Sequence, residues 1–191
     1  MPHINLGNDE AGIRSLFMYR PETAHPMRML AEVLLRGPST LSRGERELIA
    51  TYVSSRNGCS YCTASHAECA SAQLPEGMEL VDQVRTDVTT APVTPKLAAL
   101  LRIAAAVQES GKAVNADDVA IARDAGATDL EIHDTVLIAA AFCMYNRYVD
   151  GLATTLRPDQ AAYAAAAQVI LNNGYLPAAS QSAASPLVAH G

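Results

Sequence analysis

Four residues within twenty positions have the types and spacing for chemistry: Glu47, Cys59, Cys62 and His66. The cysteines form a C-x-x-C, His66 follows the second cysteine by four residues, and Glu47 precedes the first by twelve. Two thiols at this spacing can form a disulfide with little backbone movement, and a nearby imidazole and carboxylate can move protons on and off them. The set therefore favours thiol redox chemistry.

Two other interpretations fit parts of this pattern. C-x-x-C-x-x-x-H supplies three zinc ligands, with Glu47 as a fourth, but structural zinc sites usually draw on two separated ligand pairs. The sequence has no second C-x-x-C and no H-x-H pair. The other interpretation is purely structural, with two inert buried cysteines beside a surface histidine and glutamate. Cys69 and Cys143 lie in Ala-rich segments without an evident partner and are predicted to be small buried hydrophobes.

A helical hairpin is predicted to hold the four residues. Ser42-Arg-Gly-Glu45 is a capping box, and the helix that it opens ends at Asn57-Gly58, residues that tolerate the left-handed conformation. A second helix is expected over residues 59–73. The C-x-x-C therefore lies at the start of the second helix of the hairpin.

The hairpin predicts how the four side chains meet. Cys59, Cys62 and His66 follow an i, i+3, i+7 pattern, which places them on one helix face. At the rise of an α-helix, His66 lies roughly 10 Å from Cys59, and Glu47 lies roughly 15 Å back from the turn on the antiparallel helix. We expect Glu47 and His66 to meet, directly or through one water. A cysteine in the first turn also faces unpaired backbone N–H groups, which favour the thiolate.

Helix signals continue along the chain, and no strand is convincing. Hydrophobic residues make up 49%, largely as alanine, with two Phe and no Trp, a composition that favours close-packed helices and an all-α fold. The further predicted helices cover residues 10–19, 25–35, 75–88, 96–109, 115–126 and 128–145 or beyond, and a last one has Pro158 as its first residue and ends near Asn173-Gly174.

Length and charge limit the class of protein. We expect one domain over residues 1–176, followed by a flexible Ala/Ser/Pro-rich tail over 177–191. The formal net charge of -6 disfavours nucleic acid and anionic membranes as partners. The N-terminus does not resemble a signal peptide and no apolar run reaches a membrane-spanning length, so a cytoplasmic protein is predicted.

The spacing Glu47-x11-Cys59-x-x-Cys62-x-x-x-His66 resembles the motif of the alkylhydroperoxidase AhpD-like proteins in the carboxymuconolactone decarboxylase superfamily. Segments 45–50, 57–66 and 146–152 are similar to an uncharacterised peroxidase-related branch, and the resemblance covers roughly residues 12–156. It implies an AhpD-like helical bundle and a homo-oligomer, commonly a trimer or a hexamer. It implies no bound cofactor and no metal.

The resemblance also implies a role for each residue. Cys62 would attack the hydroperoxide and become the sulfenic acid, whereas Cys59 would donate a proton and then resolve the sulfenic acid to a disulfide. His66 and Glu47 would form the proton relay. An external dithiol, which is a lipoyl-bearing protein in the best-known members, would reduce the disulfide. The predicted function is therefore a thiol-dependent hydroperoxide reductase.

One position departs from the pattern, because Tyr61 stands where the well-known alkylhydroperoxidases carry a histidine. A phenol is a poor base at neutral pH, so the help of that histidine is absent or replaced. The alternative function is that of a decarboxylase-like lyase or another non-peroxidase member. The decarboxylase branch acts on a cyclic lactone acid and generally lacks the C-x-x-C. Candidates for the pocket walls, with core packing as the alternative, are Tyr52, Tyr61, Tyr145 and Asn146.

Overall fold

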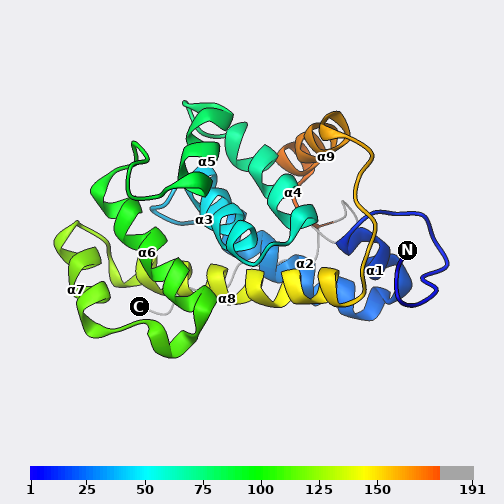
Figure 1. Cartoon of the computed structure of the whole chain (residues 1–191), viewed down its shortest axis with the longest axis horizontal. Coiled ribbons are helices and arrows are strands. Elements are labelled where there is room, and N and C mark those ends of the chain that lie inside the picture. Colours follow the sequence, from blue (N-terminus) through cyan, green and yellow to red (C-terminus); the bar gives the residue numbers. More distant parts are fainter. Residues whose placement is uncertain (177–191) are drawn as a thin grey trace.

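The computed structural model describes residues 1–176, and in this part of the chain all regular structure is helical (Figure 1). The predicted all-α fold is confirmed, while the predicted tail over 177–191 lies outside the described residues. The helices are α1 (Ile13–Tyr19), α2 (Pro21–Arg36), α3 (Arg43–Arg56), α4 (Ser60–Ser71), α5 (Gly77–Thr86), α6 (Pro95–Glu109), the short 3-10 helix η1 (Gly111–Ala113), α7 (Ala116–Asp124), α8 (Asp129–Gly151) and α9 (Gln160–Asn173).

The α3–α4 hairpin forms the centre of the packing. α3 lies against α4 on one side and against α6 and α8 on the other, and α9 packs along α4. In Figure 1, α8 runs across the lower half of the molecule, with α7 toward one end and α1 toward the other. Large apolar side chains from α3, α6 and α8 are fully buried between these helices, and each stabilises the fold by about 1.5–3 kcal/mol. They include Leu48, Ile49, Leu100, Leu101, Ile138 and Phe142.

The predicted capping box at the start of α3 is formed, and α8 begins with a second one. The Ser42 hydroxyl accepts from the Glu45 backbone N–H, and the Glu45 carboxylate accepts from the Ser42 backbone N–H. Thr128 and Glu131 cap α8 in the same reciprocal way. Each cap satisfies two backbone donors that the first helical turn leaves unpaired, so it fixes where the helix begins.

The start of α2 differs from the prediction. The helix begins at Pro21 and runs through Pro26, whereas the sequence predicted a start at residue 25. Pro21 fits the first helical position because its ring presets φ and its missing N–H would have no partner there. Pro26 costs one hydrogen bond, to the carbonyl of Glu22, but both residues are exposed and water can satisfy that carbonyl.

The start of α9 also differs. Pro158 was predicted as its first residue, but the helix begins at Gln160, with Asp159 as its N-cap. The Asp159 carboxylate accepts from the Ala162 backbone N–H at 2.9 Å, a contact that proline cannot make. The first helix starts at Ile13 rather than at residue 10, and α5 is shorter at both ends than predicted.

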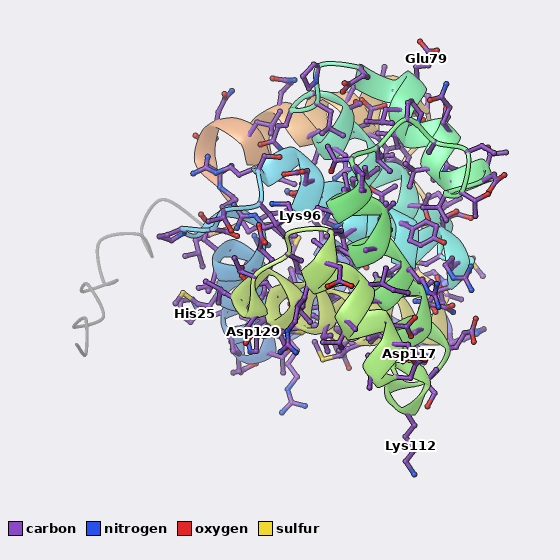
Figure 2. All side chains as sticks on the ribbon, turned by 90° about the vertical axis from the view of Figure 1, so that its left-hand side faces the viewer. His25, Glu79, Lys96, Lys112, Asp117 and Asp129 are labelled. Carbon is purple, nitrogen blue, oxygen red and sulfur yellow. The ribbon has the colours of Figure 1, made fainter. Side chains whose placement is uncertain are left out.

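One buried ion pair ties α6 to α8. The Lys96 ammonium lies 2.8 Å from Oε1 of Glu131, which is 1% exposed, and the Thr40 hydroxyl donates to the same oxygen. Burial opposes ionisation of Glu131, but these donors and the Thr128 N–H outweigh it and lower its pKa to about 2. Figure 2 shows Lys96 at the body of the molecule, in contrast to Glu79 and Lys112, which extend from opposite ends.

No helix among residues 1–176 combines the length and the apolar character needed to cross a membrane.

Replacing Lys96 by methionine should lower the free energy of unfolding by about 2 kcal/mol at neutral pH, because the buried carboxylate loses its charged partner. The folded pKa of Glu131 lies below its ordinary value of 4.5, so its contribution is complete above 4.5 and disappears as the pH falls toward 2. Urea unfolding as a function of pH should show the two proteins converging in that window. Lys112→Met, at an exposed site, is the control; an equal loss in both variants would contradict the prediction.

Candidate active site

The turn between α3 and α4 places the first cysteine. Gly58 has a φ of +72°, which a residue with a side chain rarely adopts, and it reverses the chain so that the Cys59 N–H donates to the Ser54 carbonyl at 3.1 Å. Cys59 was predicted to be the first residue of the second helix, but it is the N-cap of α4, which begins at Ser60. Cys62 therefore lies in the first helical turn, close to unpaired backbone N–H groups.

A buried amide network holds this turn against α6 and α8. The Asn57 side-chain amide donates to Oδ1 of Asn146 at 2.8 Å, and Asn146 donates to the Ser54 hydroxyl at 3.1 Å. Gln108 donates to Oδ1 of Asn57 at 3.0 Å. Asn146 is 1% exposed, so its amide has no water to replace these partners. The network fixes the segment that carries both cysteines.

Glu47 and His66 meet across the hairpin, which confirms the contact that their spacing predicted. Oε2 of Glu47 lies 2.7 Å from Nδ1 of His66. A carboxylate only accepts, so Nδ1 carries the hydrogen and Nε2 is the ring nitrogen left for proton transfer. The Phe142 ring packs edge-on against the imidazole, with 4.6 Å between centroids. The imidazole is thereby fixed in both orientation and tautomer.

Tyr175 completes this cluster, although the sequence did not indicate it. Its hydroxyl donates to Oε1 of Glu47 at 2.6 Å, and its ring stacks on His66. Gly174, with a φ of +78°, ends α9 and turns the chain back toward α2, where the Tyr175 N–H donates to Glu32 at 2.7 Å. One sequence signal could have indicated Tyr175: it directly follows Gly174, which ends a helix, in a chain with few aromatic residues.

The cluster sets the protonation of His66. Burial favours the neutral ring, but the negative charge of Glu47 and the hydrogen bond to it outweigh burial and raise the pKa of His66. Glu47 itself is 2% exposed, so its charge is poorly screened by water. The arrangement therefore favours an imidazolium close to the C-x-x-C.

The two thiols are shifted in opposite directions. A hydrogen bond from the Cys59 thiol lowers the pKa of Cys62, and the positive charge of His66 and a contact with Asn146 add to this against the effect of burial. The same hydrogen bond and burial raise the pKa of Cys59 well above its ordinary value. Such a split assigns the thiolate to Cys62 and the retained proton to Cys59.

A cleft of about 550 Å³ leads to Cys62, and its size is that of a small-molecule site. α1, α2, α4, α8 and α9 contribute to its walls, and His66 and Cys62 lie among its lining residues, whereas Cys59 does not. Of the four predicted wall residues, Tyr61 and Tyr145 line this cleft. Tyr52 and Asn146 do not, because they are buried in the core and in the amide network.

The comparisons with known proteins agree with this geometry. Residues 21–73, which include the whole Glu47–His66 segment, match the carboxymuconolactone decarboxylase family. The structure is similar to that of an uncharacterized peroxidase-related protein from Ralstonia eutropha JMP134 described as an alkylhydroperoxidase AhpD core, with 25% identity, a TM-score of 0.72, and coverage of 78% of this chain and 77% of that one. The chain therefore has an AhpD-like fold, and its residues 21–73 are similar to the carboxymuconolactone decarboxylase family.

Two further structures are similar to the AhpD-like chain. An uncharacterized peroxidase-related protein from Silicibacter sp. TM1040 has 26% identity and a TM-score of 0.72, over 80% of this chain and 78% of that one. A protein of unknown function from Agrobacterium tumefaciens, described as an antioxidant defence protein candidate, has 20% identity and a TM-score of 0.67, over 83% and 100%. At 20% identity, the similarity to the Agrobacterium tumefaciens protein shows a shared fold and nothing more. No curated protein matches the sequence.

Tyr61 has a packing role in this AhpD-like chain. Its ring lies against Tyr163, and a Cβ placed on Gly12 would approach it to 2.2 Å, so only glycine leaves room for the ring there. Burial raises the pKa of Tyr61, with the Arg157 guanidinium opposing, and the phenol keeps its proton at neutral pH. The position that holds a histidine in the well-known alkylhydroperoxidases is here a wall of the cleft.

The other two cysteines, Cys69 and Cys143, do not line the cleft. Cys69 is buried, as predicted, and burial raises the pKa of its thiol. Cys143 is only half-buried, and its sulfur accepts from the Asn57 amide at 3.5 Å, so the prediction of a partnerless buried side chain is wrong there. Among residues 1–176 no three His, Cys, Asp or Glu side chains are grouped so that they could hold a metal ion.

Glu47→Gln should lower the pKa of His66, because the charge that raises it is removed while burial remains. The pKa of Cys62 should rise in turn, since the nearby positive charge is weakened. An NMR titration of the imidazoles and the pH dependence of alkylation of Cys62 by iodoacetamide measure the two effects. The exposed His133 serves as the internal control. Unchanged titration of both groups would remove Glu47 from the cluster.

Tyr175→Phe should lower the free energy of unfolding by about 2 kcal/mol, because Oε1 of the buried Glu47 loses its hydrogen-bond donor. The pKa of His66 should rise further, since the imidazolium then stabilises the carboxylate with less help. Urea unfolding and the imidazole titration measure these effects. Tyr19→Phe, at an exposed position, should change neither quantity. A variant that is destabilised with an unshifted His66 would make Tyr175 a packing residue only.

Proposed function

We propose that this protein is a thiol-dependent hydroperoxide reductase in which Cys62 attacks the peroxide and Cys59 resolves the product to a disulfide. The observation that carries the proposal is the asymmetry of the thiol pair. The pKa of Cys62 is lowered and that of Cys59 raised, and Cys62 is the one that lines the cleft. A thiolate, not a thiol, is the nucleophile in sulfur chemistry, so the accessible sulfur is also the reactive one.

The proposed reaction balances in two steps. The Cys62 thiolate attacks the terminal oxygen of the hydroperoxide, the O–O bond breaks, and the sulfur is oxidised to sulfenic acid while an alkoxide leaves with a proton from the protein. The Cys59 sulfur then attacks the sulfenic acid, forms the disulfide and releases water. An external dithiol reduces the disulfide and returns both thiols. In total, one hydroperoxide and two thiols give one alcohol, one water and one disulfide.

The buried cluster supports the proton transfers. The His66 cation stabilises the thiolate before attack, and its Nε2–H or the Cys59 thiol supplies the proton for the alkoxide. Glu47 holds the imidazole through Nδ1, and Tyr175 holds Glu47. Glu47 and Tyr175 are therefore positioning residues in the proposal, whereas the two cysteines and His66 act at the reacting atoms.

The similar structures support the same class of activity. Those from Ralstonia eutropha and Silicibacter are both described as peroxidase-related. A dithiol reductant, such as a lipoyl-bearing protein, a homo-oligomeric assembly and a cytoplasmic location remain part of the proposal. The resemblance to the superfamily supports the reductant and the assembly.

A decarboxylase-like lyase is the second candidate, and the family match over residues 21–73 is the observation that favours it. A lyase acting on a lactone acid has no need for two thiols with opposite proton affinities, so the thiol pair separates the two candidates. Turnover of a carboxylated lactone by the Cys62→Ser variant would favour the lyase.

Free-thiol counting and intact mass before and after one equivalent of tert-butyl hydroperoxide test the proposal. The wild-type protein should lose two of its four thiols, and peptide mapping should place the disulfide between Cys59 and Cys62. Cys62→Ser should abolish the reaction. Cys59→Ser should still react once and stop at a sulfenic acid that dimedone traps, because no resolving thiol is present.

Cys143→Ser, which alters a thiol outside the cleft, is the matched control and should react as the wild type does. Peroxide consumption that survives in Cys62→Ser would reassign the attacking sulfur. Four intact thiols in the wild-type protein would reject the reductase and leave the lyase as the candidate.

A further inference from the structure

The cleft over Cys62 is lined by more positive than negative charge. Arg14, Arg28 and Arg157 contribute to its walls, and Glu10 is the only carboxylate among its lining residues. The chain as a whole carries a formal net charge of -6, so this balance is opposite to that of the protein. A local excess of guanidinium groups in a concave site attracts anions.

Arg157 is held in the cleft by aromatic rings. Its guanidinium carbon lies 5.9 Å from the ring centre of Tyr61 and 5.8 Å from that of Tyr163. Its Nε is buried and has no hydrogen-bond partner within residues 1–176. Stacking presents the planar fork in a fixed orientation, and a buried donor without a partner is costly unless a ligand satisfies it. Arg157 is therefore prepared to bind an acceptor.

Arg14 and Arg28 add charge without full neutralisation. Arg14 pairs with Glu10 at 2.8 Å, but Arg28 lies over the Phe17 ring, with 4.7 Å to its centre, and has no carboxylate partner among the described ion pairs. Burial, followed by repulsion from Arg14, lowers the pKa of Arg28. An anion bound beside Arg28 would offset this repulsion.

Apolar side chains form much of the remaining lining of the cleft, and those on α9 are mostly small. Alanines there leave space beside the larger side chains of α1 and α2, so a chain of methylene groups can lie along the wall and be removed from water. A ligand that matches these walls has an apolar body and one anionic end. The apolar lining residues include Ile13, Met27, Ala162, Ala166, Val169 and Ile170.

We propose that the cleft binds hydroperoxides that carry a carboxylate on an apolar chain. The guanidinium groups of Arg14, Arg28 and Arg157 hold the carboxylate, the α9 wall covers the chain, and the –OOH group reaches Cys62. The hydroperoxide part rests on the proposed reductase function, whereas binding of the carboxylate does not. The chemical step is the one given above, because the carboxylate changes the orientation of the substrate and not the bonds that break.

The first experiment compares linoleic acid hydroperoxide with its methyl ester, which differs only in the charge. Thiol loss in a single turnover should be about tenfold faster with the acid at equal, subsaturating concentrations, a factor typical of one charge-assisted hydrogen bond. Added salt should reduce the advantage. In Arg14→Gln and in Arg157→Gln, the acid should react no faster than the ester does in the same variant.

Arg123→Gln is the matched control, because Arg123 also pairs with an exposed carboxylate but lies on α7, at the opposite end of the molecule from α1 (Figure 1). It should keep the preference for the acid. Arg28 is not used as a test variant, since its guanidinium also donates to the Tyr175 carbonyl and its loss would disturb the cluster at Glu47.

A second experiment measures binding without peroxide. Decanoate and methyl decanoate are titrated calorimetrically into the reduced protein, and decanoate should bind at least tenfold more tightly, with the advantage lost in Arg157→Gln. Equal binding of acid and ester, or a preference that survives both arginine substitutions, would overturn the proposal. Arginine-dependent binding of decanoate in a protein that no peroxide oxidises would support the carboxylate site and reject the reductase.

Discussion

The structure depends on a carboxylate that is almost completely removed from water. Ionised Glu47 would cost several kcal/mol in the interior if it were unpaired, so its surroundings must supply donors to both oxygens. His66 supplies one from α4 and Tyr175 supplies the other from the segment after α9. The Glu47 carboxylate therefore connects the α3–α4 hairpin with the segment that follows α9.

The hydrogen bond between Glu47 and His66 stabilises the buried carboxylate and also affects the protonation of the nearby thiols. The charge of Glu47 favours protonated His66, the positive ring favours a thiolate at Cys62, and the shared hydrogen bond leaves the proton on Cys59. Each of these effects acts between neighbouring residues of one helical hairpin. Because stability and reactivity share these atoms, substitutions at Glu47 act on both.

How much the sequence could predict follows from the separation of the residues involved. The capping box of α3, the hairpin and the meeting of Glu47 with His66 depend on short spacings within 42–73, where helical periodicity is reliable. Tyr175 lies 109 residues from His66, and no local pattern specifies that packing. The walls of the cleft come from five helices, and its arginines are far apart in the sequence. Only the tertiary fold brings them together, so the sequence did not predict this charged site.

Tyr61 stands where the family motif has a histidine, and it also shapes the cleft, because its ring lies beside the Arg157 guanidinium. A histidine there could exchange protons with the thiols, whereas the phenol is buried and keeps its proton. The mechanism that we propose therefore assigns proton transfer to His66 and Cys59. The ring instead gives the Arg157 guanidinium a face to stack on. Tyr61 therefore lacks the acid–base function of a histidine, but its ring face can bind a guanidinium group. This property fits the proposed site for an anionic substrate, which must orient the substrate and does not require a second base.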